Sequence, residues 1–498
     1  MKTLQLKIII HCFLILMLML VSSPNIKATT KHAESNQKDV FKAGAASVNI
    51  TPPVGSIMGN SYGITVAEGV HDDLFAKALV FETGEDRAVL IALDLISIPH
   101  QIVIRTRELV EEKTGIPAKN ILMTATHVHA GPQLNPLFWE VVGGVPKQKS
   151  KEYARKLPEM IAKSVQMAVS KLHPVKISVG KIQEKTINFN RRFLMKDGSF
   201  KMNPGQLNEN SVRPVGPVDP DLSVIKIETM DSKPVAFMVN FALHVAVVGG
   251  THFSADFPST VSSLLAQVYG EDVVTIFTNS TSGNVNHVDV MQTEQLENYS
   301  ESQRIGTILA ANVMKVIPAL RPIEPERLQV ESLEVELPVP AVNENETDWA
   351  QRVINNMGQP EPPPFSDVVQ AWRIMDLTQH GNNEERHNLT TTVPLTQDGK
   401  ALKSEVQVIT LGKEIALVGF PGDAFAELGL AIKLHSPFPF TVINEQSGNG
   451  TISYVPNRKA FSEGGYEVIS ARYSPGGGEI LVEAVNKLLI ELYPYRSK

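Results

Sequence analysis

The segment NILMTATHVHAGP, residues 120–132, combines an apolar run with two histidines, His127 and His129, that lie one residue apart. The apolar run predicts a buried strand, and the Gly-Pro end predicts a loop. Residues i and i+2 of a strand point to the same face, so both imidazoles would lie together at the carboxyl end of the strand, where α/β sheets usually form binding sites. The pair is a candidate metal site; the alternative is two ordinary polar residues at a strand end.

Strand-like and helix-like segments alternate on both sides of this one. Residues 76–83 and 88–96 are predicted strands, whereas residues 99–115 and 151–173 carry the periodicity of amphipathic helices. This alternation predicts an α/β fold. Residues 341–392 break the pattern with the Pro-rich QPEPPPF and the polar QHGNNEERHN. They predict an insertion over one face, either a lid or a plain surface excursion.

The N-terminus has the composition of a secretory signal peptide. Two lysines precede an apolar core from Ile8 to Val21, and small and polar residues follow. We therefore predict a signal peptide over residues 1–28, a linker over residues 29–40, and a secreted, periplasmic or cell-surface location. An uncleaved anchor is the alternative, although the core is shorter than the roughly 20 residues that span a bilayer. The single cysteine, Cys12, lies in this segment, so the mature chain is predicted to lack disulfides.

The composition excludes one class of partner. The chain is 43% hydrophobic and 20% charged, which is typical of a globular protein, and its net charge is -7. The mature region has no long cluster of lysine and arginine. Binding to nucleic acid through bulk electrostatics is therefore not expected.

Later segments contain further side chains that could bind a metal. His244 interrupts the apolar AFMVNFALHVAVVGG, where it is either a ligand or a satisfied core histidine. Asp423 follows a Pro-Gly turn, and its alternative role is to cap the next helix. Tyr454, Tyr466 and Tyr473 lie close together near the C-terminus of a chain with nine tyrosines. Each of these signals is modest by itself.

A serine nucleophile is a further alternative. Ser280 and Ser282 lie in NSTSGN, at the end of the predicted strand TIFTN. Neither serine stands in the G-x-S-x-G elbow of a serine hydrolase, and loops rich in Gly, Ser and Asn are commonly turns.

Taken together and in this order, the segments resemble the neutral (alkaline, non-lysosomal) ceramidase family over about residues 42–495. THVHAGP is similar to the family segment whose first histidine binds zinc and whose second is catalytic, which implies His127 as a ligand and His129 as the base. FALHV resembles the family's FAIHP and implies His244 as a ligand. The resemblance also implies mixed β-sheets with flanking helices, in a ceramidase-type catalytic domain.

The remaining site residues follow from the same resemblance. PGD resembles the family's PGE and implies Asp423 as a ligand, one methylene shorter than the family's glutamate. ISY and YE have the spacing of the family's THY and YE, which implies Tyr454 as the fourth ligand and Tyr466 as an active-site hydroxyl. FNRR resembles INRS and implies Arg191 as the arginine of the site.

The chain also departs from the family pattern. GNVNHV places Asn286 where the family has a serine, which excludes a covalent serine mechanism at this position and puts ceramide as the substrate in doubt. We assign Asn286 and Tyr473 to substrate contact. The chain ends where the family's catalytic domain ends, without an immunoglobulin-like domain, so we predict a single metallohydrolase domain over residues 41–498.

The function implied is a secreted, zinc-dependent hydrolase of an N-acyl amide bond. The substrate would be a ceramide-like sphingolipid, met at a membrane surface, or a carbohydrate-derived or other N-acylated small molecule. Zn²⁺ would activate a water whose pKa falls to roughly 7 in the best cases. His129 would accept its proton, Arg191 and Tyr466 would stabilise the oxyanion, and Asp94 and Asp256 would orient the ligand imidazoles. A catalytically silent binding protein is the alternative from another class.

Overall fold

The computed structural model describes residues 40–59, 62, 65–293, 295–296, 298–378, 394–450 and 452–494. All of them belong to the unit Asp39–Lys498. The predicted signal peptide and all but the last residue of the predicted linker lie outside the described residues, as do residues 379–392 of the predicted insertion. No helix in the described part of the chain is apolar over a length that could cross a membrane.

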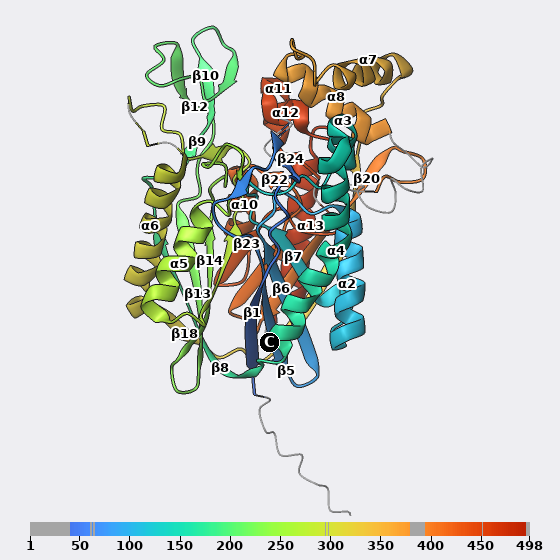
Figure 1. The fold of residues 1–498 in the computed structure, drawn as a ribbon. Helices are drawn as coiled ribbons and strands as arrows, with labels where there is room; N and C mark the ends of the chain where they lie inside the picture. Colours follow the sequence, from blue (N-terminus) through green and yellow to red (C-terminus); the bar gives the residue numbers. More distant parts are fainter. Residues whose placement is uncertain are drawn as a thin grey trace, which may run out of the picture. The chain divides into compact units, whose positions relative to one another are not determined.

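Nine described strands form one mixed sheet (Figure 1). In spatial order they are β16 (Val274–Asn279), β14 (Pro234–Phe241), β13 (Asp221–Thr229), β8 (His173–Gln183), β1 (Lys42–Asn49), β5 (Phe75–Thr83), β6 (Asp86–Leu93) and β7 (Ile121–Ala125), with β18 (Arg321–Ile323) also paired to β8. The pairs β14/β16 and β6/β7 are parallel, and the other pairs are antiparallel. The two strands predicted at residues 76–83 and 88–96 are β5 and β6, so the α/β prediction is confirmed.

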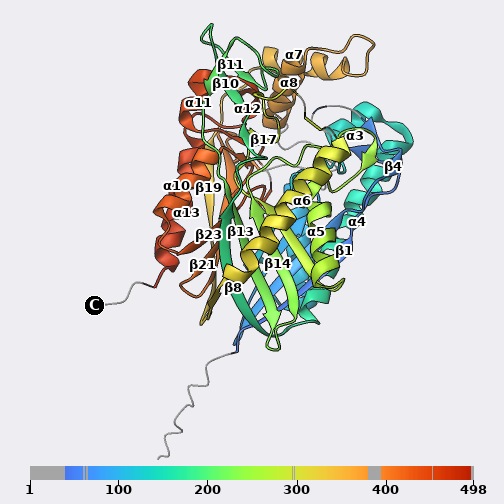
Figure 2. The ribbon, with the colours of Figure 1, turned by 90° about the vertical axis from the view of Figure 1, so that its left-hand side faces the viewer.

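Helices cover one face of this sheet (Figures 1 and 2). The two predicted helices are α2 (His100–Thr114), which ends at Gly115 in the left-handed conformation, and α4 (Gly144–Val169). They pack on the strands from β1 to β7 through one apolar cluster. The helices α5 (Phe257–Tyr269) and α6 (Asn298–Val316) cover β13, β14 and β16 through another.

A second sheet covers the opposite face. Its strands are β19 (Leu328–Pro338), β20 (Ala401–Leu411), β21 (Ile415–Gly419) and β23 (Phe440–Asn444). Apolar side chains of both sheets, such as Leu79 and Leu417, form one buried cluster between them. Since both faces of β5 and β6 are covered, these strands are apolar almost throughout instead of alternating. The outer face of the second sheet carries α10 (Ala426–His435) and α13 (Gly477–Leu492), as Figure 2 shows.

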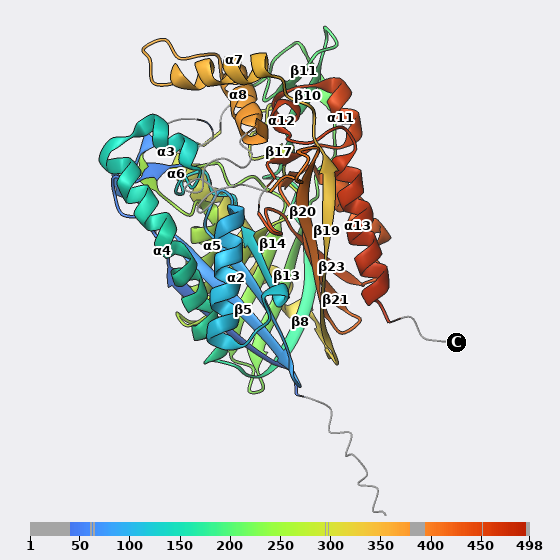
Figure 3. The same cartoon turned by 90° about the vertical axis from the view of Figure 1, so that its right-hand side faces the viewer.

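Two helices of the predicted insertion lie between β19 and β20 in the sequence. They are α7 (Glu344–Asn355), which begins with a capping box at Asn343, and α8 (Phe365–Thr378). Figures 1 and 3 show them at the same end of the unit as α3 (Pro136–Val142) and α12 (Tyr466–Ser470). An apolar cluster joins both helices to α3.

Short elements complete the described chain. They are β2 (Ile57–Met58), β3 (Thr65–Val66), β4 (Gly69–Val70), η1 (Ala118–Asn120), β9 (Phe189–Asn190), β10 (Arg192–Met195), β11 (Phe200–Met202), β12 (Ser211–Pro214), β15 (His252–Phe253), β17 (Val285–Asn286), η2 (Ile317–Ala319), β22 (Asp423–Ala424), β24 (Tyr454–Val455) and α11 (Arg458–Glu463).

The carboxyl ends of the parallel strands meet at one place. The backbone nitrogen of Ala125, the last residue of β7, donates to the carbonyl of Gln446, which follows β23. The backbone nitrogen of Glu445 in turn donates to the carbonyl of Asn279, the last residue of β16. The loops that follow these strands are therefore brought together from both sheets.

Candidate metal centre

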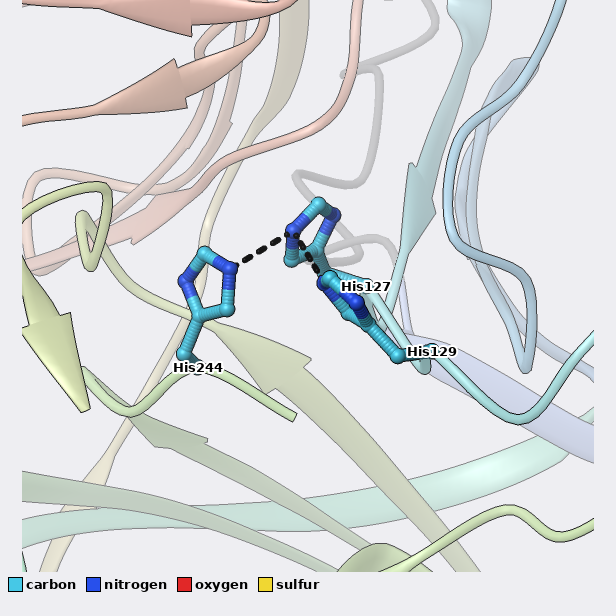
Figure 4. A group of neighbouring side chains, drawn as sticks. All are labelled: His127, His129 and His244. Carbon is cyan, nitrogen blue, oxygen red and sulfur yellow. Dashed lines mark hydrogen bonds between the residues drawn. The ribbon is translucent and has the colours of Figure 1, made fainter. Parts of the chain in front are cut away.

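The two histidines of THVHAGP lie in the loop after β7, not in the strand. The strand ends at Ala125, and His127 adopts a φ of 64°, which is uncommon for a residue other than glycine. The prediction that strand alternation puts both imidazoles on one face is therefore wrong. The turn at His127 brings them together instead, with 3.2 Å between their Nε2 atoms (Figure 4). Backbone hydrogen bonds from Thr126 to Leu93 and from Val128 to Leu95 hold this loop.

His244 completes a cluster of imidazoles. It follows β14, and its Nε2 lies 3.1 Å from that of His127 (Figure 4). Ligand atoms of His127, His129 and His244 all lie within 4.8 Å of one another, and His244 is 2% exposed. The structure therefore brings His244 to the histidine pair rather than leaving it as an isolated core residue.

Asp423 and Tyr454 reach the same point from the second sheet. Asp423 Oδ2 lies 3.0 Å from His127 Nε2, and the Tyr454 hydroxyl lies 3.3 Å from His244 Nε2. The two residues are adjacent because β22 and β24 pair in parallel, with Asp423 opposite Tyr454. The helix-cap alternative for Asp423 is wrong, because α10 begins at Ala426 with Phe425 as its cap.

This donor set fits a divalent cation. Ligands held about 2.0–2.2 Å from a tetrahedral metal lie roughly 3.3 Å apart, close to the spacing of these nitrogen and oxygen atoms. The second carboxylate oxygen of Asp423, Oδ1, is buried and has no hydrogen-bond partner among the described residues. Imidazole, carboxylate and phenol donors suit zinc and several other divalent metals. By distance alone, His129 is as well placed to bind the cation as His244.

Backbone carbonyls orient the imidazoles. His127 Nδ1 donates to the carbonyl of Ile96 at 2.8 Å, and His244 Nδ1 donates to that of Ser282 at 3.4 Å. These bonds leave each Nε2 directed at the centre. The prediction that Asp94 and Asp256 do this is wrong. Asp94 accepts from the backbone nitrogen of Phe75. Asp256 is the N-cap of α5 and accepts from the backbone nitrogens of residues 247, 248 and 257.

The electrostatics of the centre favour a cation. Burial lowers the pKa of His129 to about 3 and holds the pKa of His244 well below its usual range, so both are neutral at pH 7. Burial acts to raise the pKa of Asp423, but His127 and His244 outweigh it and lower that pKa. Burial also raises the pKa of the Tyr454 phenol. The Asp423 carboxylate thus lies close to two imidazoles, those of His129 and His244, that carry no charge at pH 7.

Arg191 lies behind the tyrosines. Its guanidinium carbon is 5.3 Å from the centroid of the Tyr454 ring and 5.9 Å from that of Tyr466. Arg191 Nε donates to Glu467 at 3.0 Å, and Nη2 donates to the carbonyl of Gly283 at 2.7 Å. Glu467, which is fully buried and also bonds Arg192, was not singled out from the sequence. The ion pair fixes Arg191 against the tyrosines.

A cavity of about 140 Å³ opens onto the centre. The described residues that line it are Tyr62, Ile96, Ser97, Pro99, His127, His129, Gln133, Asn135, Phe138, Asp423, Gln446, Ser453, Tyr454, Tyr466 and Arg472. Five of the predicted site residues are in this set, and His244 lies directly behind them. Tyr62, Gln446 and Arg472 were not predicted. Gln446 comes shortly after β23 and Arg472 shortly after α12, and this position just beyond the end of an element is the signal that the sequence offered for them.

Two predicted substrate contacts lie elsewhere. Asn286 is in β17, where its amide nitrogen donates to Asn203 at 3.2 Å. Tyr473 is 1% exposed in the apolar cluster between the second sheet and α13, with its ring 6.2 Å from that of Phe461. Neither side chain is among the described residues that line the cavity.

Glu445 is a second buried acid that the sequence analysis missed. It follows β23, at a strand end where polar residues often serve a site. It accepts from the Ser282 hydroxyl at 2.6 Å and from the backbone nitrogens of Ser282 and Ala424. Burial and the Asp423 carboxylate raise its pKa well above the usual range. Ser280 and Ser282 are both fully buried, so a serine nucleophile at either position has no access to substrate.

The layers and the centre define a class of protein: two β-sheets between helical layers, with a candidate metal centre in the loops at the carboxyl ends of the strands. Comparison with known proteins then identifies the family. Residues 41–287 match the family described as neutral/alkaline non-lysosomal ceramidase, N-terminal. The chain belongs to this family, which confirms the resemblance seen in the motifs.

Individual relatives agree with this assignment. Neutral ceramidase B of Dictyostelium discoideum is 26% identical over 254 residues, which are 48% of this chain and 34% of the relative. Neutral ceramidase A of the same organism is 22% identical over 227 residues, 44% of this chain and 31% of the relative. The alignments thus span about a third of the length of these curated relatives.

Solved structures confirm the predicted fold. Neutral ceramidase from Pseudomonas aeruginosa matches with a TM-score of 0.67 and 17% identity, over 92% of this chain and 76% of that one. A ceramidase complexed with C2 matches with the same TM-score and identity, over 92% of this chain and 77% of the other. The mixed sheets with flanking helices are therefore those of the neutral ceramidase fold.

Proposed function

We propose that this protein is a hydrolase that cleaves an N-acyl amide bond with the help of a divalent cation, zinc being the first to test. The observation that carries the proposal is the convergence of His127, His244, Asp423 and Tyr454 on one point at the base of a cavity. Membership of a family whose relatives are named as ceramidases supports amide hydrolysis as the reaction.

Each protein group has a definite part in this proposal. A cation bound by the four ligands would supply Lewis-acid activation of water and of the acyl carbonyl. His129, 3.2 Å from His127 and lining the cavity, accepts the proton of the attacking water and delivers it to the leaving amine. The water oxygen bonds to the acyl carbon, the C–N bond breaks, and the amine leaves with the proton.

The tyrosines and Arg191 act on the other side of the acyl group. The Tyr466 side chain lines the cavity and lies against Tyr454, with 5.1 Å between the ring centroids. Its hydroxyl is placed to donate to the oxyanion that forms during attack. Arg191 positions both tyrosines from behind and is paired with Glu467, so we assign it a positioning role.

The test joins metal content to turnover. Purified protein is assayed by elemental analysis, and amine release is measured from ceramide and from shorter N-acyl amides, with and without a chelator. We expect one zinc per chain and chelator-sensitive amine release. His244→Ala should lose both, whereas His252→Ala, which changes an exposed histidine outside the centre, should lose neither. Full zinc occupancy in His244→Ala would contradict the ligand set, and metal-independent turnover would contradict the mechanism.

A further inference from the structure

One helix of the insertion supports the outer wall of the cavity. The Phe365 ring of α8 lies 6.0 Å from that of Tyr62 and 5.6 Å from that of Tyr466. The ring of Trp372, also in α8, is stacked on that of Phe138, with 4.0 Å between the ring centroids and 12° between the ring planes. Tyr62, Tyr466 and Phe138 all line the cavity. Because Phe365 and Trp372 of α8 contact these three side chains, the position of α8 determines where they lie.

A buried ion pair holds the same helix in place. Asp376 of α8 accepts hydrogen bonds from Nε and Nη2 of Arg472, a fourth lining residue. The two side chains are 10% and 11% exposed. Moving α8 outward would separate these charges in a site that water barely reaches, and an unpaired buried charge is strongly destabilising. The wall is thus fixed by electrostatics as well as by packing.

The cavity inside this wall is small and has both polar and apolar lining residues. Its volume of about 140 Å³ lies well below the ≈ 300–1,000 Å³ typical of pockets that enclose a drug-sized ligand. Amide and hydroxyl side chains line much of it: Ser97, Gln133, Asn135, Gln446 and Ser453. The amide oxygen of Gln446 is buried without a hydrogen-bond partner among the described residues. A long acyl chain would exceed this volume.

We propose that α8 restricts this site to compact substrates, namely short-chain N-acyl amides of a polyhydroxylated amine. The inference rests on the proposed function, because it specifies the substrate of the same centre. The short acyl group occupies the aromatic side formed by Tyr62, Phe138 and Tyr466. The hydroxyl groups of the amine bond the amide and hydroxyl side chains opposite. Phe365, Trp372 and Asp376 act as specificity determinants through the residues they support.

The test uses one amine with acyl groups of increasing length. N-acetyl-, N-hexanoyl- and N-palmitoyl-glucosamine are compared for kcat/KM with zinc-loaded protein, the last in detergent micelles, together with a long-chain ceramide. We expect kcat/KM to fall by roughly 100-fold or more from the acetyl to the palmitoyl compound, because the cavity volume of about 140 Å³ is too small for the surplus methylenes. Comparable turnover of the palmitoyl compound or of ceramide would overturn the inference.

A variant of the wall separates α8 from other causes of selectivity. Phe365 is 52% exposed, so Phe365→Ala should fold while removing the support of Tyr62 and Tyr466. We expect the ratio of hexanoyl to acetyl turnover to rise by about tenfold. Asp348→Ala, at an exposed position of α7, is the matched control and should leave the ratio unchanged. An unchanged ratio in Phe365→Ala would remove α8 as the determinant.

Calorimetric binding of the same compounds distinguishes the failure of this inference from the failure of the proposed function. If no compound is hydrolysed but the acetyl compound binds and the palmitoyl compound does not, the size limit stands and the hydrolase proposal fails. If the palmitoyl compound is hydrolysed as well as the acetyl compound, the hydrolase proposal stands and the size limit fails. If none binds and none is hydrolysed, both fail.

Discussion

Replacing Gly283 by alanine tests how the centre is assembled from two sheets. Gly283 lies in the loop after β16, and its backbone nitrogen donates to the carbonyl of Ala424 at 2.7 Å. A Cβ atom at this position would lie 2.3 Å from the carbonyl oxygen of Asp423. Ordinary contact begins at 3.4 Å, so the loop and the Asp423 segment would have to separate by about 1.1 Å.

The magnitude follows from what this separation breaks. Overpacking of this kind costs typically 1–3 kcal/mol, and the lost backbone hydrogen bond costs about 0.5–1.5 kcal/mol more. We therefore expect Gly283→Ala to lower the free energy of unfolding by about 1.5–4.5 kcal/mol. Zinc affinity should fall by about 10- to 100-fold, as it does when groups that hold a ligand in place are changed.

Two measurements check this prediction. Urea unfolding of the metal-free protein, followed by circular dichroism, gives the stability, and competition with a chromophoric chelator gives the zinc affinity. Gly249→Ala is the control, because nothing lies within 4 Å of the Cβ that it adds. If Gly283→Ala behaved like Gly249→Ala in both measurements, the close approach of the loop and the Asp423 segment would not be what holds the centre together.

Three further predictions concern the insertion, a buried acid and the N-terminus. Asp376→Ala should lower the free energy of unfolding by about 3–5 kcal/mol because it leaves Arg472 unpaired; a loss below about 1 kcal/mol in urea titrations would contradict the role of the ion pair. Burial raises the pKa of Glu427 above 4.5, so its stabilising contribution is present below pH 4.5 and is lost as the pH rises through its folded-state pKa. Relative to wild type, Glu427→Gln should therefore be more stable at pH 7 than at pH 4, and equal pH profiles would count against this. Sequencing of the exported protein should start near residue 29, and an intact Met1 would contradict the signal peptide.

Local patterns were sufficient for much of the fold. Residues 76–83 and 99–115 formed the predicted strand and helix because burial on both faces demands an apolar run, and a half-buried helix demands periodicity. Strand alternation failed at His127, where the strand had already ended and the backbone turns to a φ of 64°. Local propensity does not predict a histidine in the left-handed backbone conformation. The strain at His127 is balanced by hydrogen bonds from the neighbouring residues to a segment about 30 residues earlier in the chain.

By itself, the sequence determined the α/β class and, through the order of its motifs, the family and the side chains that meet at His127. Only the tertiary structure decided what surrounds them. The groups that orient the imidazoles are the carbonyls of Ile96 and Ser282, and every residue has a carbonyl, so no sequence pattern distinguishes these two. The support of the cavity wall by Asp376 depends on a contact with Arg472, 96 residues later, which forms only when the two sheets and the insertion have packed together.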